Sequence, residues 1–212
     1  MKRHAAPDPA VKRLSLYLRQ LEEHAADRVE KVSSRQLAES LHVTSAQVRK
    51  DLAYFGQFGR SGVGYRVGPL IEQLRRILGT DKTWNVIVVG AGDLGRALLR
   101  YRGFRRKGFE LVAAFDIANA KVGRTVGPVP VYHVDELPRI VREYDVRLAI
   151  LTVPAEAAQG ITELLCRSGI MGVLNFAPTT LQPSTDIAIG PVDLAAHLEQ
   201  LSFQVAGRTR TV

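Results

Sequence analysis

A glycine-rich motif in the middle of the chain limits the possible folds more than any other feature. It has the spacing G-x-G-x-x-G and consists of Gly90, Ala91, Gly92, Asp93, Leu94 and Gly95. An apolar run over residues 84–89 precedes it, and a helical pattern over residues 96–101 follows it. Between a strand and a helix, the first glycine forms the turn, the second lets a pyrophosphate approach the backbone, and the third lets helix and strand pack closely. The motif therefore predicts a doubly wound α/β (Rossmann) domain that binds a dinucleotide.

A second apolar run supports this prediction because it ends in an acid at the expected distance. Residues 111–115 are apolar, and Asp116 follows them, 21 residues after Gly95. An acid at this place accepts hydrogen bonds from the adenosine ribose hydroxyls and disfavours the 2′-phosphate of NADP. Lys121 and Arg124 follow nearby and weaken that preference. We expect NAD(H) as the ligand, with a vacant site or another nucleotide-like ligand, such as coenzyme A, as alternatives.

The rest of the domain continues the alternation of strands and helices. We expect strands at residues 129–132, 148–153, 173–175 and 187–189 and helices at residues 135–143 and 155–167. The ends of two of these strands carry Thr152, Val153, Pro154, Asn175, Phe176 and Ala177. Since ligands of such sheets bind beyond the carboxyl ends of the strands, these residues form either the wall of the nicotinamide pocket or ordinary loops.

The positive charge of the chain is concentrated in its first part. The 212 residues include 29 Lys+Arg and 21 Asp+Glu, a net charge of +8. Residues 1–80 hold 14 basic and 8 acidic residues, a net +6, which leaves +2 for residues 81–212. A basic module joined to a nearly neutral one indicates a polyanion-binding domain, although a solvated basic surface is the alternative.

The basic module shows the pattern of a helix-turn-helix. A first helix begins at Pro9, a second follows the capping-box pair Ser33 and Gln36, and a third spans residues 45–55 after Thr44. The candidate DNA-contacting residues of the third helix are Ser45, Gln47, Arg49, Lys50 and Tyr54. Arginine and lysine read guanine edges or bind phosphates, and glutamine pairs with adenine. The pattern indicates DNA binding, with an ordinary helical hairpin as the alternative.

The segment after the third helix resembles the wing of a winged helix. Residues 56–67 contain four glycines and two arginines and end in β-forming residues, which favours a short hairpin. Its candidate DNA contacts are Arg60, Gly62 and Tyr65, with Arg60 suited to a narrow minor groove. A phosphate-binding P-loop is not favoured because no Gly-Lys-Ser/Thr follows. A linker helix then runs to Gly79.

A final helix over residues 192–205 carries an apolar stripe. The stripe consists of Leu194, Leu198, Leu201 and Val205, spaced by four, three and four residues. Such spacing resembles a heptad seam, so the helix packs either on a partner subunit or on its own domain. The expected organisation is a winged-helix domain over residues 1–80, a Rossmann domain over residues 81–190 and a C-terminal helix over residues 191–212.

Composition excludes several other classes of protein. One cysteine, Cys166, excludes a disulfide framework, and the five histidines show no metal-ligand spacing, so no metal is expected. No apolar stretch is long enough to span a bilayer and no signal-peptide core is present, so we expect a cytoplasmic protein without a membrane partner. The cofactor domain leaves no room for a substrate domain, which favours a dinucleotide that acts as a signal. A small NAD-dependent oxidoreductase with a basic N-terminal module is the alternative.

Together these motifs resemble the Rex family of redox-sensing transcriptional repressors. The resemblance covers about residues 10–205. It rests on the strings VRKDL (48–52), YFG (54–56), GVGY (62–65), the glycine motif, Phe115-Asp116 and NFAP (175–178). The resemblance implies a homodimeric repressor of fermentation and anaerobic respiration genes that NADH releases from operator DNA and that NAD⁺ does not.

The resemblance also implies switch residues and an exchange of the terminal helix between subunits. Arg13, Tyr101 and Asp193 match the polar group that rearranges between the nicotinamide pocket and the DNA-binding domain. The chain departs from the family pattern in two places: Leu194 stands where relatives often have Phe, and Ala118 replaces an acid. The first departure puts a stacking contact on the nicotinamide in doubt.

Overall fold

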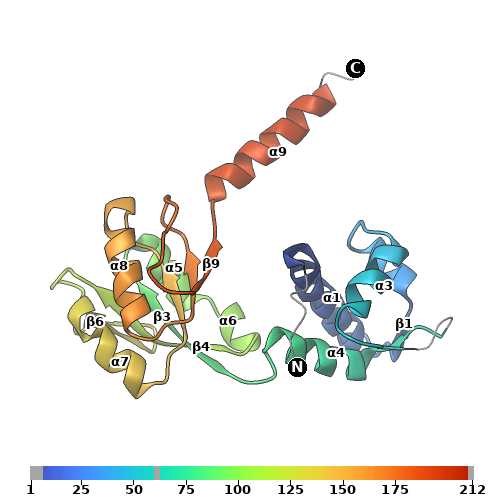
Figure 1. The fold of residues 1–212 in the computed structure, drawn as a ribbon, viewed down its shortest axis with the longest axis horizontal. Coiled ribbons are helices and arrows are strands. Elements are labelled where there is room, and N and C mark those ends of the chain that lie inside the picture. The colour runs from blue at the N-terminus through green and yellow to red at the C-terminus, as the bar shows by residue number, and fades with distance from the viewer. Residues whose placement is uncertain (1–6, 60–62, 210–212) are drawn as a thin grey trace. The chain divides into compact units, whose positions relative to one another are not determined.

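The chain divides into two compact units, Met1–Lys82 and Thr83–Val212, each with its own core. The computed structural model describes residues 7–59 and 63–209 (Figure 1). Arg60 and Gly62, two of the predicted wing contacts, lie outside the described residues.

The first unit is a small helical domain with a two-stranded sheet. Its elements are α1 (Asp8–Ala26), β1 (Lys31–Val32), α2 (Ser34–Glu39), α3 (Ser45–Ala53), β2 (Tyr65–Arg66) and α4 (Val67–Leu78). The largest fully buried side chains of its core are Leu14, Tyr17, Leu21, Leu37, Leu52, Leu70 and Leu74. Apolar residues at helical spacing on α1 and α4 face each other across this core, and α3 closes it.

Local hydrogen bonds define the helix-turn-helix. The Ser33 hydroxyl accepts from the backbone N–H of Gln36 at 3.2 Å, and the side-chain Oε1 of Gln36 accepts from the backbone N–H of Ser33 at 2.8 Å, which confirms the capping box of α2. Thr44 caps α3 by accepting from the Gln47 N–H at 3.1 Å. The helix α3 ends at Ala53, two residues earlier than expected.

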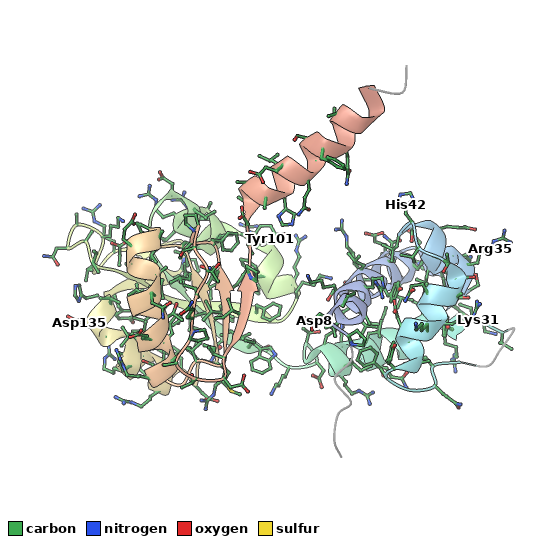
Figure 2. All side chains as sticks on the ribbon, turned by 45° about the horizontal axis from the view of Figure 1, so that its top comes forward. Asp8, Lys31, Arg35, His42, Tyr101 and Asp135 are labelled. Carbon is green, nitrogen blue, oxygen red and sulfur yellow. The ribbon has the colours of Figure 1, made fainter. Side chains whose placement is uncertain are left out.

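The strand of the wing has a partner that the sequence did not predict. The strand β2 pairs antiparallel with β1, which precedes α2. Val32 lies opposite Tyr65 in this pairing and is buried against the helical core. This long-range partner was not predicted from the sequence, and the local hairpin stays a prediction because its tip lies outside the described residues. Figure 2 shows Lys31, Arg35 and His42 directed to solvent from this unit.

The second unit is a doubly wound α/β domain, as the glycine motif predicts. Its strands are β3 (Trp84–Val89), β4 (Phe109–Asp116), β5 (Thr125–Val126), β6 (Val129–His133), β7 (Leu148–Leu151), β8 (Gly172–Asn175) and β9 (Ala188–Pro191). Its helices are α5 (Asp93–Arg100), α6 (Gly103–Arg106), the 3₁₀ turn η1 (Val134–Glu136), α7 (Leu137–Glu143), α8 (Ala155–Arg167) and α9 (Leu194–Thr209). The strand order is β5-β6-β4-β3-β7-β8-β9, and β5 alone is antiparallel to its neighbour.

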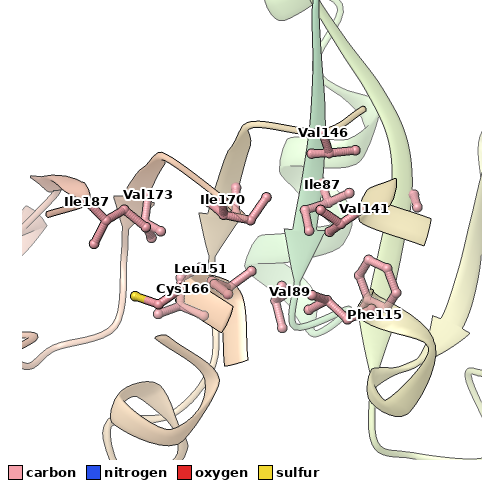
Figure 3. Packing of buried hydrophobic residues seen from close by; sticks show 14 of the residues in the cluster. Ile87, Val89, Phe115, Val141, Val146, Leu151, Cys166, Ile170, Val173 and Ile187 are labelled. Carbon is pink, nitrogen blue, oxygen red and sulfur yellow. The ribbon is translucent and has the colours of Figure 1, made fainter. Parts of the chain in front are cut away.

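The two faces of the sheet are covered by different helices. Apolar residues of α7 and α8 pack on one face against Ile87, Val89, Phe115 and Leu151 (Figure 3). Leu99 of α5 and neighbouring residues of α6 pack on the other face. This arrangement brings the carboxyl ends of β3, β4 and β7 to one edge, where the glycine motif lies. Cys166 is buried among the first group of residues, as expected of a structural thiol.

Several boundaries of the second unit differ from those predicted. The helix after the glycine motif begins at Asp93 and ends at Arg100, so Tyr101 follows the helix instead of lying within it. The short elements β5 and α6 were not predicted, since two to four residues carry too little periodicity. The terminal helix begins at Leu194. Within the described residues, no helix is both long enough and apolar enough to cross a membrane.

Candidate functional site

A cavity of about 590 Å³ lies at the carboxyl ends of β3, β4 and β7. Its predicted wall residues are Gly90, Gly92, Leu94, Asp116, Lys121, Thr152, Val153, Pro154 and Phe176. An adjoining cavity of about 680 Å³ shares Leu94 and Phe176 with it and contains Asn175 and Ala177. The strand topology thus gathers at one edge the residues that sequence reasoning placed at strand ends. The space suits an extended ligand with an adenosine half and a second half.

Two glycines of the motif stand where no side chain fits. Gly90 has a φ of +103°, and a Cβ atom there would lie 2.6 Å from the Thr152 carbonyl oxygen. A Cβ atom on Gly95 would overlap the Gly90 carbonyl oxygen, so the turn and α5 touch backbone to backbone. A Cβ atom on Gly92 would meet nothing within 4 Å, so this position faces open space. These contacts agree with turn and packing roles for Gly90 and Gly95 and with ligand approach at Gly92.

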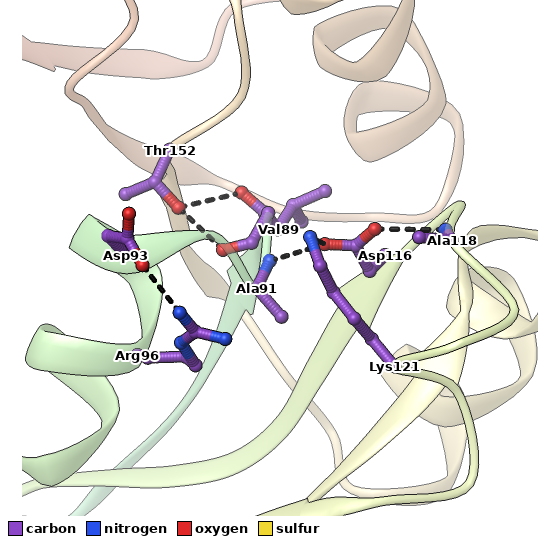
Figure 4. A network of polar contacts seen from close by, with 9 residues as sticks. Val89, Ala91, Asp93, Arg96, Asp116, Ala118, Lys121 and Thr152 are labelled. Carbon is purple, nitrogen blue, oxygen red and sulfur yellow. Dashed lines mark hydrogen bonds and ion pairs between the residues drawn. The ribbon is translucent and has the colours of Figure 1, made fainter.

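Thr152 holds the glycine turn, whereas Asp93 bonds within the helix that follows the turn. The Thr152 hydroxyl donates to the Gly90 carbonyl at 2.8 Å, so this wall residue also holds the loop (Figure 4). Asp93 is exposed at the first turn of α5 and pairs with Arg96. Gly92 and Leu94, at the start of α5, line the cavity, and a helix N-terminus favours an anionic phosphate.

Asp116 is the centre of a polar network at the end of β4. Its Oδ2 accepts from the Ala91 N–H at 2.9 Å and from Lys121 Nζ at 2.8 Å, and its Oδ1 accepts from the Ala118 N–H at 2.9 Å (Figure 4). Burial by itself raises the pKa of Asp116, but the hydrogen bonds from Lys121, Ala118 and Ala91 outweigh it and lower the pKa. The carboxylate is therefore ionised at neutral pH, as an acceptor for ribose hydroxyls must be.

Asn175 and Ala177 form the floor of the adjoining cavity. Asn175 is buried, its Oδ1 accepts from the Ala177 N–H at 2.9 Å, and its Nδ2 donates to the Thr179 carbonyl at 3.0 Å. The Asn175 amide therefore fixes the loop after β8. Asp193 also lines this cavity and accepts from the Ala196 N–H at 2.9 Å, which caps α9. In the described part of the chain, no group of three or more His, Cys, Asp or Glu could hold a metal ion.

On the first unit, α3 presents a basic face to solvent. Arg49, Lys50 and Tyr54 are exposed, and Ser45 is half-buried at the first turn. Arg49 Nη1 donates to the Ser34 hydroxyl at 3.1 Å, which holds its guanidinium over the start of α2. Tyr65 of β2 is half-buried, and burial raises the pKa of its phenol. The described candidate DNA contacts on α3 and β2 are thus exposed or half-buried, and their role stays a prediction.

Asp51 and Tyr17 are site residues that sequence reasoning missed. Asp51 lies on α3, is fully buried, and accepts from Arg13 and Tyr17 of α1 and from Gln47 of its own helix. A polar residue among the apolar positions of α3 was the available signal, together with Arg13 and Tyr17 four residues apart on α1. Arg13, predicted as a switch residue, is thus bound to Asp51 in this structure.

Tyr101, a second predicted switch residue, lies just after α5. The residue is 60% exposed (Figure 2). Its ring contacts Phe104 edge-to-face, with ring centroids 5.1 Å apart. Tyr101 is not among the residues that line the dinucleotide cavity or the adjoining one.

Comparison with known proteins identifies the family. Residues 81–179 match the family model described as a CoA binding domain, and residues 6–53 match that of a putative DNA-binding protein N-terminus. The chain is 45% identical over 205 residues to the redox-sensing transcriptional repressor Rex of Carboxydothermus hydrogenoformans, which covers 97% of this chain and 99% of the relative. The chain belongs to the Rex family. The Rex repressor of Syntrophomonas wolfei is 43% identical over 210 residues, which is 99% of this chain and 100% of that relative.

Solved structures of the Rex family agree with this assignment. RSP in complex with β-NAD⁺ and operator DNA has a TM-score of 0.89 and 36% identity, covering 95% of this chain and 93% of RSP. RSP in complex with β-NADH has a TM-score of 0.87 and 34% identity, covering 97% of this chain and 96% of RSP. The curated Rex relatives are transcriptional repressors, so the predicted repressor is confirmed and the oxidoreductase alternative is not supported.

Proposed function

We propose that this chain represses transcription by binding operator DNA through its first unit, and that NADH bound to its second unit releases the DNA. The observation that carries this proposal is the presence, in one Rex-family chain, of an exposed basic recognition helix and a dinucleotide cavity with an ionised ribose acceptor. Such a repressor acts in the cytoplasm, where the operator is. NADH shifts the protein away from DNA only if it binds the released form more tightly.

Each part of the cavity has a defined task toward the dinucleotide. The backbone at Gly92 and the start of α5 receive the pyrophosphate, and Asp116 receives the adenosine ribose. Thr152 and Asn175 hold the two loops that border the second half of the ligand. The remaining contacts that we propose are the cavity-lining residues Leu94, Lys121, Val153, Pro154, Phe176 and Ala177, together with Ala91 and Asp93 of the glycine motif.

On the DNA side, Arg49 and Lys50 read or grip the operator, and Ser45, Tyr54 and Tyr65 support them at the backbone. Fluorescence anisotropy with a duplex selected by the protein from a random library tests the proposal. We expect NADH to lower the affinity for this duplex and NAD⁺ to leave it nearly unchanged. Equal affinities with NADH and NAD⁺ would refute redox sensing, and selection of no duplex would refute operator binding.

We also propose that the protein is a homodimer joined by α9. Leu194, Leu198, Leu201 and Phe203 of this helix are 54–78% exposed within their own unit, which is unusual for so many large apolar side chains on one helix. The sheet also has an apolar groove of about 320 Å³, and Leu148 is one of its wall residues. An apolar helix face can bury such a groove. The α9 helix of a second copy is the proposed occupant. We propose that Arg13, Tyr101 and Asp193 report the nucleotide state across this dimer.

A further inference from the structure

The buried carboxylate of Asp51 calls for an explanation, because it lies in the middle of the proposed DNA-reading helix. Asp51 is 0% exposed, and the other residues that α3 buries, Val48 and Leu52, are apolar. An ionised carboxylate in such a place is costly unless hydrogen bonds and an opposite charge compensate it. A helix that needed only to pack would have an apolar residue here.

Four hydrogen bonds compensate the cost of burying the Asp51 carboxylate. Oδ2 accepts from Arg13 Nε at 2.6 Å and from the Tyr17 hydroxyl at 2.8 Å. Oδ1 accepts from Arg13 Nη2 at 2.8 Å and from Gln47 Nε2 at 2.7 Å. A carboxylate has about four acceptor positions, so every position of Asp51 is filled. Burial by itself raises the pKa of Asp51, but the bonds from Arg13, Tyr17 and Gln47 lower it, so the group is ionised at neutral pH.

These bonds fix the rotation of α3 about its own axis relative to α1. A bidentate arginine–carboxylate pair is restricted in angle as well as in distance, unlike an apolar contact. With Asp51 turned to α1, the opposite stripe of α3 at positions 46, 49, 50 and 53 is exposed. This spacing of three, four and seven residues is one helix face. Arg49 and Lys50 therefore point outward because Asp51 points inward.

The same network removes Gln47 from that outward face. Gln47 is half-buried, and its amide nitrogen is bound to Asp51. Reading adenine requires the glutamine amide to present its nitrogen and oxygen together to the base edge. The bond to Asp51 turns the amide back toward α1.

We propose that Asp51 is a positioning residue for operator recognition, and that Gln47 supports Asp51 and reads no base. This assignment rests on the proposed operator binding. It replaces the interpretation of Gln47 as an adenine-reading residue, which helical spacing alone had suggested. Loss of either side chain then weakens binding to every operator variant in the same proportion, whereas loss of a base-reading residue changes the preference at one base pair.

The test uses the full chain and the duplex that the wild-type protein selects from a random library, with a panel in which each base pair is substituted. The variants are Gln47→Ala, Asp51→Asn and the double variant. Matched controls are Gln20→Ala and Glu39→Gln, which remove surface groups of α1 and α2 that bond only within their own helices. Circular dichroism melts establish the temperature at which each variant is fully folded, and anisotropy is measured there.

We expect Gln47→Ala to lower affinity by about fivefold, the net effect of one hydrogen bond, with the ranking of the panel unchanged. We expect Asp51→Asn to lower it by at least about tenfold, and the double variant to match Asp51→Asn because both act through one network. Gln47→Ala keeps the Arg13 and Tyr17 bonds, so it still tests the assignment if Asp51→Asn does not fold.

Three results would overturn the assignment. The first is a relaxed preference at one A·T pair in Gln47→Ala, which would make Gln47 a base-reading residue. The second is full operator affinity in folded Asp51→Asn, and the third is additive losses in the double variant. If the wild-type protein selects no duplex, the proposed function fails, and this assignment fails with it.

Discussion

Replacing Asp116 by asparagine tests the dinucleotide site most directly. The change keeps the size of the side chain but removes its negative charge. That charged carboxylate accepts hydrogen bonds from the N–H groups of Ala91 and Ala118 and from Lys121. An asparagine amide cannot accept at both of its ends, so one donor of the network loses its partner. The wall residues at the ends of β3 and β7, Gly90, Gly92 and Thr152, are not altered by this change.

The expected loss of NADH affinity follows from the hydrogen bond that the Asp116 carboxylate gains from the ribose and the ion pair with Lys121 that it gives up. A hydrogen bond to a charged group contributes about 1.5–3 kcal/mol. The ribose hydroxyls compete with Lys121, whose partly exposed ion pair with Asp116 contributes about 0–1 kcal/mol. The difference is about 0.5–3 kcal/mol, which is a loss of about 2- to 150-fold in NADH affinity.

Isothermal titration calorimetry with NADH measures this loss, and Asp145→Asn is the control. Asp145 is an exposed acid that pairs with Arg147, away from the cavity, and asparagine tolerates its positive φ. We expect the control to bind NADH as the wild type does and both variants to keep their operator affinity without NADH. An unchanged dissociation constant for folded Asp116→Asn would refute the ribose-acceptor role.

The remaining predictions concern the glycine turn, the recognition helix and the terminal helix. Gly95→Ala places a Cβ atom against backbone, so it should lower the melting temperature, whereas Gly92→Ala should leave it unchanged and weaken NADH binding in calorimetry. Because the pKa of Asp51 is lowered in the folded state, its stabilising effect is present above the unfolded value of about 3.9 and is lost as pH falls through the folded value. Urea titrations should therefore show that the stability gap between wild type and Asp51→Asn narrows below about pH 4. Leu198→Glu with Leu201→Glu should convert the proposed dimer to a monomer in sedimentation velocity, while stability of the Rossmann unit is kept, because both residues are exposed within it.

Local sequence signals were sufficient wherever neighbouring residues define the structure. The capping box at Ser33, the glycine motif and the acid at position 116 each depend on spacing over a few residues, and the structure contains all three. Apolar periodicity likewise predicted the order of strands and helices in the Rossmann unit. These features follow from backbone geometry that any fold must satisfy, so the sequence alone indicates them.

Tertiary structure decided the features that depend on distant partners. Helical spacing places Gln47 one turn before the exposed Lys50, but the bond from Gln47 to Asp51 draws it toward α1. The strand β2 pairs with the distant strand β1, and this pairing places Val32 in the helical core.

The sequence by itself thus determined the family, the two-part organisation and the chemistry of the ligand, because motifs encode local backbone shape and charge. Only the tertiary structure decided which polar side chains of α3 face solvent and which face the interior. The physical reason is that a buried carboxylate must fill its acceptor positions with whatever donors surround it, and two of the donors to Asp51, Arg13 and Tyr17, come from a helix more than 30 residues away.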